Sequence, residues 1–262
     1  MELSTAQLAE YRERGFLLLP DLLRPEEAEV LRAAMPALTD RDAPQVRREA
    51  PGGPPKIVYG PHADSAAYAA AARLPRVLRP VEQLLGEPAW LYQGRINLKV
   101  PFAGDAWSWH QDFTAWHRND GMPRPHAVMT AVFLHDCTVA NGPLLVIPGS
   151  HSDDLDTILD READVEGYKA ERVTVETLAR LAERGGIVDL RGRAGSVAFI
   201  HPTLLHGSAA NMTPWARSIL YLNYSAASNR TRRSHRPWFM NDVDAAPLAP
   251  GDDDALMPRR AA

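Results

Sequence analysis

The sequence predicts an α+β fold in which helices come first and an antiparallel β-sandwich or jelly roll follows. Helix-capping signals collect before residue 88, whereas alternation of polar and apolar residues begins at Leu91. The later strand-like runs are short, and turns rich in Gly and Pro separate them without a regular alternation of strand and helix. This arrangement favours a sandwich or jelly roll over a doubly wound parallel sheet.

The first predicted elements are helices. Ser4 and Gln7 have the spacing of a capping box, and Pro25 suits the first turn of a helix that runs through Leu31. Two further helices are expected over 65–72 and 76–85, the second ended by Gly86. The helical N-terminal part therefore covers about 1–88.

The first predicted strand runs from Leu91 to Val100, and its two faces differ in chemistry. One face is polar and the other mainly apolar: Gln93, Arg95, Asn97 and Lys99 against Tyr92, Ile96, Leu98 and Val100. Further strands are expected over 128–134, 144–147, 196–200 and 218–224. These strands define a β core of about 89–226.

A charged stretch interrupts this core. Residues 152–172 are weakly periodic, and Thr174 can then cap a helix that ends before Gly185, so we expect an insertion over about 152–186. Such a segment could form a lid over a site, and a surface excursion without function fits equally well. The tail of about 245–262 is expected to add little to the core. The chain, 1–262, is expected to form one domain.

Bulk composition excludes several classes of protein. A chain of 262 residues with 45% hydrophobic content can bury a full core, and its net charge of −4 offers no excess of Lys and Arg for nucleic acid. Neither a signal peptide nor an apolar run of about 20 residues for a membrane is found. The single cysteine, Cys137, excludes an internal disulfide framework. A cytoplasmic location is expected, and the oligomeric state, monomer or homodimer, stays open.

A histidine and an aspartate separated by one residue could bind one metal ion from the same face of a strand. The pattern occurs three times, at His62/Asp64, His110/Asp112 and His151/Asp153. Asp64 precedes an alanine-rich helix and Asp153 follows a turn, so a role as a helix cap or turn former explains both. His110 and Asp112 lie instead in the aromatic run 107–113, whose bulk would exclude water around a metal.

A facial triad needs a third ligand from elsewhere in the fold. His206 is the best candidate because it follows the predicted strand 196–200; for this residue alone, a buried histidine bonded to the backbone is the alternative. Eleven residues later Arg217 opens another strand, where a guanidinium inside a barrel could clamp a cosubstrate carboxylate.

Further motifs run in a fixed order through 93–224. They are Gly104-Asp105-Ala106-Trp107-Ser108-Trp109-His110-Gln111-Asp112-Phe113, Trp116, Asp120-Gly121-Met122-Pro123, Asn141-Gly142-Pro143-Leu144, Ile147-Pro148-Gly149-Ser150-His151, His206-Gly207-Ser208, Asn211-Met212-Thr213-Pro214 and Arg217. In this order they resemble the phytanoyl-CoA dioxygenase superfamily, in the branch of ectoine hydroxylase and proline trans-4-hydroxylase. The resemblance implies a double-stranded β-helix, a cupin-like jelly roll. It also implies a dioxygenase that uses Fe(II), 2-oxoglutarate and O2 and releases hydroxylated product, succinate and carbon dioxide.

The predicted site residues form three groups, and the resemblance assigns all of them by position except Trp107, Arg95 and Tyr221. The groups are the iron ligands His110, Asp112 and His206, the cofactor-site residues Arg217, Ser208, Asn97 and Trp107, and the substrate-site residues Gln93, Trp116, Arg95 and Tyr221. Arg95 and Tyr221 join the last group on geometry alone, and an outward, solvated Arg95 is an alternative.

The expected substrate is a small polar molecule. Ectoine hydroxylases resemble one another with serine between the iron-binding His and Asp, where this chain has Gln111, whereas His110-Gln111-Asp112 and Arg124-Pro125-His126 look closer to proline hydroxylases. A free amino or imino acid, or a natural-product intermediate bearing such a unit, is therefore expected, with ectoine as the alternative. Asp112 disfavours a halogenating relative, in which a small residue replaces the carboxylate.

Two other classes stay open at this point. One is a cupin-like metalloenzyme with non-redox chemistry, in which Arg217 and Asn97 would lack a cosubstrate. The other is a non-catalytic binding protein that retains the barrel.

Overall fold

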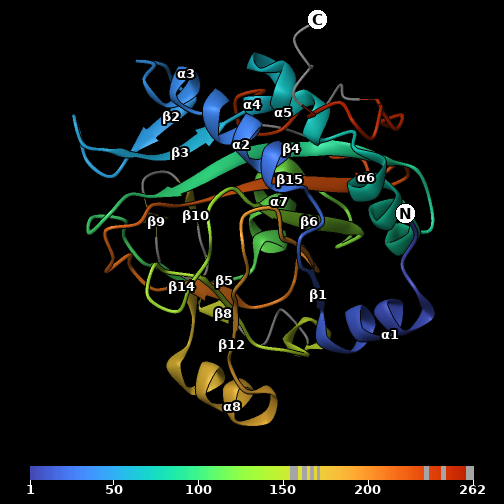
Figure 1. Ribbon diagram of the computed structural model, residues 1–262. Coiled ribbons are helices and arrows are strands. Elements are labelled where there is room, and N and C mark those ends of the chain that lie inside the picture. The colour runs from blue at the N-terminus through green and yellow to red at the C-terminus, as the bar shows by residue number, and fades with distance from the viewer. Residues whose placement is uncertain are drawn as a thin grey trace, which may run out of the picture.

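A computed structural model of the chain describes residues 1–153, 159–160, 164–165, 168–169, 172–232, 236–242 and 246–257. Two antiparallel sheets face each other, and helices cover the outer face of the larger sheet (Figure 1). The larger sheet has seven strands in the order β1-β13-β6-β15-β4-β3-β2, and the smaller has four in the order β12-β7-β14-β5. This confirms the expected jelly-roll architecture.

The strands of the larger sheet come from both ends and the centre of the chain. They are β1 (Phe16–Leu19), β2 (Val46–Arg48), β3 (Pro55–Tyr59), β4 (Ala89–Lys99), β6 (Ala127–Phe133), β13 (Val197–Ile200) and β15 (Arg217–Ala226). The smaller sheet contains β5 (Trp107–His110), β7 (Leu144–Val146), β12 (Val188–Leu190) and β14 (His206–Ser208). Two short pairs, β8 (Leu159–Asp160) with β11 (Arg172–Val173) and β9 (Asp164–Val165) with β10 (Tyr168–Lys169), lie within the predicted insertion.

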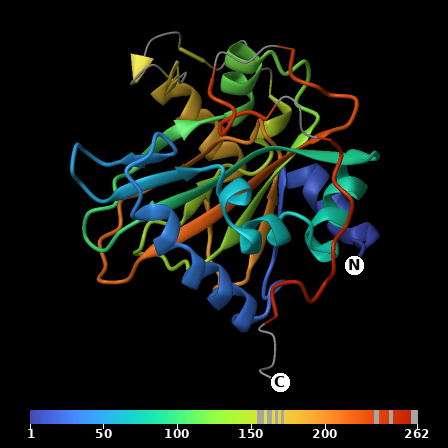
Figure 2. The same ribbon diagram turned by 90° about the horizontal axis from the view of Figure 1, so that it is seen from above.

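The helices form a layer against the larger sheet, as the view from above shows (Figure 2). This layer contains α2 (Pro25–Ala34), α3 (Pro36–Thr39), α4 (Pro61–Asp64), α5 (Ala66–Ala71) and α6 (Pro75–Leu85), while α1 (Thr5–Arg14), α7 (Asp112–Asp120) and α8 (Val175–Gly185) lie elsewhere. One apolar cluster joins Leu31 and Leu78 of the helices to Ile96 and Leu220 of the sheet. A second cluster fills the space between the two sheets.

Helix ends that depend on a specific cap are confirmed. Ser4 and Gln7 form the predicted capping box at the start of α1. Gly86 ends α6 in the left-handed conformation, with φ 71°, and the Thr174 side chain accepts a hydrogen bond from the Thr177 amide at the start of α8. The N-terminal part is not purely helical, however, because β1, β2 and β3 join the larger sheet.

The predicted alternation along β4 is wrong at Tyr92. Gln93 lies opposite Asn223 of β15, and directly after this pair the register shifts. Tyr92 therefore packs between the sheets with Trp116, at 5.0 Å between ring centroids, and not with Ile96 on the helix face. An irregularity of this kind reverses the direction in which side chains point, and no residue pattern in β4 announces it.

The expectation that the tail adds little to the core is also wrong. Leu256 is buried in the cluster beneath the helices. The Leu248 amide donates to the Ala89 carbonyl at 2.8 Å, and Asp253 forms an ion pair with Arg76 at 2.8 Å. The predicted lid over 152–172 falls mostly outside the described residues.

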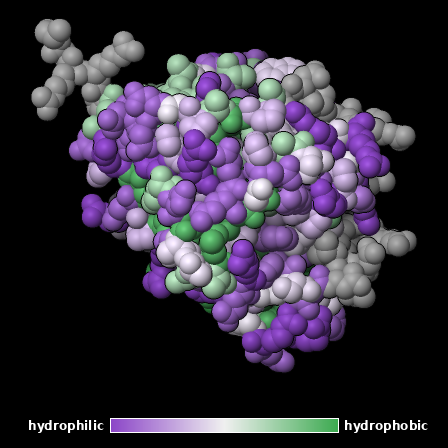
Figure 3. Space-filling model, turned by 90° about the vertical axis from the view of Figure 1, so that its right-hand side faces the viewer, coloured by the Kyte–Doolittle hydropathy of each residue, from purple (hydrophilic) through white to green (hydrophobic). Residues whose placement is uncertain are grey.

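The outer surface combines a mainly hydrophilic face with a cleft. The face in Figure 3 is mainly hydrophilic, with apolar side chains gathered across its centre. A surface cleft of about 640 Å³ lies between α1, the end of β1 and the start of α6, and none of the predicted site residues lines it. Within the described parts of the chain, no helix has the length and apolar character needed to cross a bilayer.

Candidate functional site

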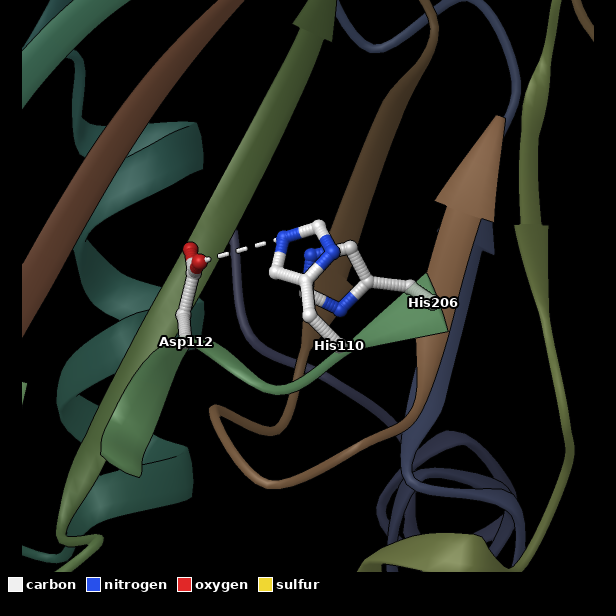
Figure 4. Close-up of side chains that lie close together, drawn as sticks. All are labelled: His110, Asp112 and His206. Carbon is white, nitrogen blue, oxygen red and sulfur yellow. Dashed lines mark ion pairs between the residues drawn. The ribbon is translucent and has the colours of Figure 1, made fainter. Parts of the chain in front are cut away.

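Two histidines and an aspartate converge between the two sheets (Figure 4). His110 ends β5, Asp112 is the first residue of α7 and His206 opens β14. One ligand atom from each lies within 4.8 Å of the others, and the two imidazole centroids are 4.2 Å apart. Among the residues that the structure describes, this is the only group of three or more such side chains with metal-binding geometry.

The expectation that His110 and Asp112 share one face of a strand is wrong in its detail. The strand stops at His110, and Gln111 serves as the residue before the first turn of α7. The change from strand to helix, rather than a skipped residue in a strand, brings the two side chains together. His110 Nε2 and Asp112 Oδ1 are 3.5 Å apart.

Backbone contacts fix the orientation of both imidazoles. His110 Nδ1 lies 2.6 Å from the Ser108 carbonyl, and His206 Nδ1 lies 2.9 Å from the Leu204 carbonyl. Because a carbonyl can only accept, each Nδ1 carries the proton and each Nε2 presents a lone pair. This is the second-sphere arrangement that metal-ligating histidines usually have.

Electrostatics keep Asp112 and His206 in the protonation states that a metal needs. Burial would raise the pKa of Asp112, but Arg95, whose Nη2 lies 2.8 Å from Asp112 Oδ2, and the two histidines together hold it well below its ordinary value. Burial, and secondarily His110, lowers the pKa of His206 to about 4. An ionised Asp112 carboxylate and a neutral His206 imidazole result at neutral pH. Two nitrogens and one carboxylate are the donor set of the facial triad of non-haem Fe(II) oxygenases, so the residues fit this metal.

The register between β4 and β15 arranges the interior polar residues in rungs. Lys99 lies opposite Arg217, then Asn97 opposite Ile219, Arg95 opposite Tyr221, and Gln93 opposite Asn223. Arg95 contacts the iron-ligand candidate Asp112, so the Lys99–Arg217 rung lies on one side of the triad and the Gln93–Asn223 rung on the other.

The Lys99–Arg217 rung is strongly cationic. Arg217 is 2% exposed and its Nε donates to the Gly142 carbonyl at 2.8 Å, while Lys99 is 1% exposed and its Nζ donates to the Ala209 carbonyl at 2.6 Å. Burial, and next the charge of Arg217, lowers the pKa of Lys99 to about 7. Two buried cations side by side have the charge that binding a carboxylate requires.

Lys99 is the functional candidate that the sequence-based assignment missed. Its place on the polar face of β4 is visible in the sequence, but a strand lysine is usually a solvated charge. The signal appears only when the register sets it opposite Arg217.

The other predicted cofactor-site residues lie around this rung. Ser208 is buried two residues after His206 in β14, and Asn97 is buried with no hydrogen-bond partner for its Oδ1. Trp107 pairs with Ser208 in the strand register, beside the apolar cluster of β3 and the 236–242 segment. The Lys56 ammonium lies over its ring, 5.1 Å from the ring centroid.

Of the predicted substrate-site residues, Arg95 contacts both Gln93 and Tyr221, and Trp116 belongs to the same apolar cluster as Tyr221. Trp116 is fully buried and its Nε1 has no hydrogen-bond partner, and the Arg95 guanidinium lies 5.0 Å from the Tyr221 ring centre. Both ends of the Gln93 amide form hydrogen bonds within the protein. Its Nε2 donates to the Met240 carbonyl at 2.6 Å, and its Oε1 accepts from Arg95 Nη1 at 3.1 Å. The alternative of an outward Arg95 is thus wrong, since the side chain points into the barrel.

Comparison with known proteins identifies the family. The phytanoyl-CoA dioxygenase model matches residues 11–219, most of the chain. The chain belongs to the phytanoyl-CoA dioxygenase family. L-proline trans-4-hydroxylase of Streptomyces griseoviridis is 36% identical over 255 residues, covering 94% of this chain and 95% of that protein. Ectoine dioxygenase of Bordetella parapertussis is 36% identical over 237 residues, covering 87% of this chain and 77% of the relative.

Solved structures of this family superpose on nearly the whole fold. EctD from S. alaskensis with 2-oxoglutarate and 5-hydroxyectoine has a TM-score of 0.82 and 33% identity, covering 95% of this chain and 86% of that one. EctD from S. alaskensis with bound Fe has the same score and identity, covering 94% and 86%. The expected reaction class is confirmed: this family member is a dioxygenase dependent on Fe(II) and 2-oxoglutarate.

Proposed function

We propose that this chain hydroxylates an unactivated C–H bond in a free amino or imino acid, proline-like in character, or in an amino-acid-derived natural-product intermediate. The observation that carries the proposal is the convergence of His110, Asp112 and His206, with both Nε2 atoms directed by backbone carbonyls and the carboxylate ionised. We assign these three residues as the iron ligands. Iron bound there, with 2-oxoglutarate and O2, supplies the oxidising chemistry of the family.

We assign the carboxylate end of 2-oxoglutarate to Arg217 and Lys99. Both side chains are buried and cationic at or below neutral pH, and Arg217 offers a planar donor fork suited to a carboxylate. Ser208 and Asn97 complete this part of the site, because Asn97 lies between Lys99 and Arg95 on β4 and Ser208 is buried two residues after His206 on β14. Trp107 shields the same region from solvent.

The opposite side of the triad is assigned to the substrate. Trp116 Nε1 and Asn223 Oδ1 are buried polar atoms without a hydrogen-bond partner, and leaving such atoms unpaired costs about 1–3 kcal/mol each. A small polar molecule that both accepts and donates hydrogen bonds would satisfy them. Tyr221, Arg95 and Gln93 border this space, and their part is to orient the substrate and exclude water.

Two substrate classes are favoured by specific observations. A proline-like substrate is the first, because the alignment with L-proline trans-4-hydroxylase covers 95% of that protein. In addition, this chain has Gln111 at the position where ectoine hydroxylases resemble one another in having serine. Ectoine is the second candidate, because the EctD structures share the fold at 33% identity. We also propose a cytoplasmic location, supported by the single cysteine, Cys137, which is buried and reduced.

The proposal is tested by succinate release. Protein loaded anaerobically with Fe(II) receives 2-oxoglutarate, O2 and one member of a panel containing proline, pipecolate, other free amino acids and ectoine. Stimulation by proline or another amino or imino acid supports the proposal, and stimulation by ectoine alone supports the second candidate. Slow succinate release that no panel member stimulates would direct the search to larger intermediates.

The control is His206→Ala, which should abolish succinate release. Absence of succinate in the wild-type protein, together with bound iron, would contradict the proposal and favour the non-redox metalloenzyme. Absence of both metal binding and turnover would favour the non-catalytic binding protein.

A further inference from the structure

Arg95 contacts the iron-ligand candidate Asp112 through only one of the two carboxylate oxygens. Arg95 Nη2 lies 2.8 Å from Asp112 Oδ2, while Asp112 Oδ1 faces His110 Nε2 at 3.5 Å. Both partners are buried, with side-chain exposures of 11% for Arg95 and 4% for Asp112. The two oxygens of one carboxylate thus have different partners.

This difference matters for the number of positions open at a metal. A carboxylate that binds through both oxygens occupies two coordination positions, whereas a facial triad needs three positions free for other ligands. With Oδ2 held by a charged hydrogen bond to Arg95, Oδ1 is the oxygen that faces His110.

Arg95 is itself held by Gln93. Gln93 Oε1 accepts hydrogen bonds from Arg95 Nη1 at 3.1 Å and from Asn223 Nδ2 at 3.3 Å. Gln93 Nε2 donates to the Met240 carbonyl at 2.6 Å, which fixes the amide so that its oxygen faces Arg95. A continuous series of hydrogen bonds therefore runs from Met240 to Asp112.

The segment that contains Met240 is anchored a second time on α7. Arg236 Nε donates to Asp120 Oδ1 at 2.9 Å, and Arg236 also contacts Tyr92, whose hydroxyl donates to the same carboxylate. Asp112 begins α7 and Asp120 ends it, so an arginine holds each end of this helix. The 236–242 segment reaches one end directly and the other through Gln93 and Arg95.

We propose that Arg95, braced by Gln93 against the Met240 carbonyl, is a positioning residue that makes Asp112 a one-oxygen metal ligand. The 236–242 segment thereby sets the geometry of the metal centre. The inference rests on the proposed function only in taking His110, Asp112 and His206 as the metal ligands. It concerns how tightly and with what coordination number the metal binds, which can be measured without turnover.

The test uses Co(II) in the full-length protein without O2-dependent chemistry. Co(II) affinity is measured by titration, and the intensity of its visible absorption reports the coordination number. Arg95→Gln should weaken Co(II) binding about 10- to 100-fold, the usual effect of losing a second-sphere partner, and should change the absorption intensity. Arg95→Lys, which keeps the charge but lacks the fork that holds Gln93 and Asp112 together, should fall between wild type and Arg95→Gln.

A double-mutant cycle tests the brace. Gln93→Leu should weaken Co(II) binding in the wild-type background and add nothing in the Arg95→Gln background, because its effect passes through Arg95. Additive effects would overturn the brace. A matched control is Tyr224→Phe, which removes a buried hydrogen bond to the Ala72 carbonyl on the helix side of β15 and should lower Tm without altering Co(II) binding.

Two further outcomes overturn the inference. The first is an Arg95→Gln variant that binds Co(II) with wild-type affinity and an unchanged spectrum. The second is a loss of affinity in Tyr224→Phe that matches its loss of Tm, since the effect would then be one of general stability. His206→Ala distinguishes failure of the inference about Arg95 from failure of the proposed function. If that variant binds Co(II) normally, the metal site itself is misassigned and the proposed function fails as well.

Discussion

Lys99 and Arg217 lie opposite each other on β4 and β15, and both side chains are almost completely buried. Among the described residues, neither forms an ion pair with a carboxylate. Lys99 donates to the carbonyls of Asp105 and Ala209, and Arg217 donates to the carbonyl of Gly142. Burial, and next the repulsion from the adjacent charge of Arg217, lowers the pKa of Lys99 to about 7. A dicarboxylate bound here would relieve this repulsion, which supports the proposed 2-oxoglutarate site.

Arg217→Ala should greatly raise the concentration of 2-oxoglutarate that the enzyme requires. Losing one partner of a buried charge pair costs roughly 3 to 5 kcal/mol, which corresponds to about a hundredfold or more in affinity. The measurement is the concentration dependence of succinate formation, with Co(II) affinity as the control for an intact metal site. An unchanged requirement for 2-oxoglutarate would remove Arg217 from the site.

The affinity for 2-oxoglutarate should depend on pH through Lys99. With the pKa of Lys99 at about 7, the free protein carries this charge below pH 7 and loses it above. A bound carboxylate favours the charged amine, so affinity should be greatest below pH 7 and decrease as the pH rises, by up to about tenfold per pH unit. Binding to protein loaded with a redox-inert divalent metal, measured from pH 6 to 9, is the check.

Lys99→Arg is the matched control for this pH dependence. An arginine stays charged over the whole range, so the variant should bind 2-oxoglutarate with a nearly flat pH profile. A steep profile that persists in Lys99→Arg would assign the titration to another group.

Gly142 lies next to both Lys99 and Arg217, and its substitution should impair both 2-oxoglutarate binding and the stability of the fold. Its φ is 77°, and a Cβ there would lie 2.5 Å from the Ala209 carbonyl oxygen and 2.8 Å from Lys99 Cδ. The Gly142 carbonyl also accepts from Arg217. The strain of an alanine in the left-handed conformation costs about 1–2 kcal/mol, and Gly142→Ala should lower the free energy of unfolding by more than this because of the added clashes. The variant should also need a higher concentration of 2-oxoglutarate.

Gly86→Ala provides the comparison. Gly86 has a similar φ of 71°, but no atom lies within 4 Å of the position of an added Cβ. This variant should show only the strain of about 1–2 kcal/mol in denaturant unfolding and normal use of 2-oxoglutarate. Equal effects of the two substitutions on 2-oxoglutarate would show that Gly142 does not act through the cationic rung.

Features that depend on residues close together in the sequence are the ones that the sequence predicts correctly. Capping at Ser4 and Gly86 depends on residues a few positions apart, so the sequence predicts it correctly. The ordered motifs likewise lead to His110, Asp112 and His206, which the fold then brings within 4.8 Å.

The missed features depend on pairing between distant segments. Lys99 becomes a candidate only because the register of β4 with β15 sets it opposite Arg217. Tyr92 lies on the side of the sheet opposite to the predicted one because that register shifts near Asn223. Leu256 is a single apolar residue in a polar tail, and only the tertiary fold shows that the core buries it. None of these contacts leaves a periodic signal in its own segment.

Two buried histidines should make the metal-free protein sensitive to acid. Burial, more than the neighbouring imidazoles, lowers the pKa of both His206 and His201 to about 4, compared with about 6.5 in the unfolded chain. A folded pKa below the unfolded one gives stability that is complete above pH 6.5 and is lost as the pH falls toward 4. Each histidine can contribute up to about 3 kcal/mol to this loss.

His201→Asn separates the two contributions, because His201 lies outside the metal site and bonds Thr203. Denaturant unfolding of metal-free protein between pH 7 and 4 should show a shallower loss of free energy in His201→Asn than in the wild type, the remainder coming chiefly from His206. Because a metal binds only the neutral imidazole of His206, saturating Co(II) should add stability at pH 7 that fades as the pH falls. If His201→Asn and wild type lose stability in parallel over this range, His201 titrates normally in the folded protein and its burial carries no energetic cost.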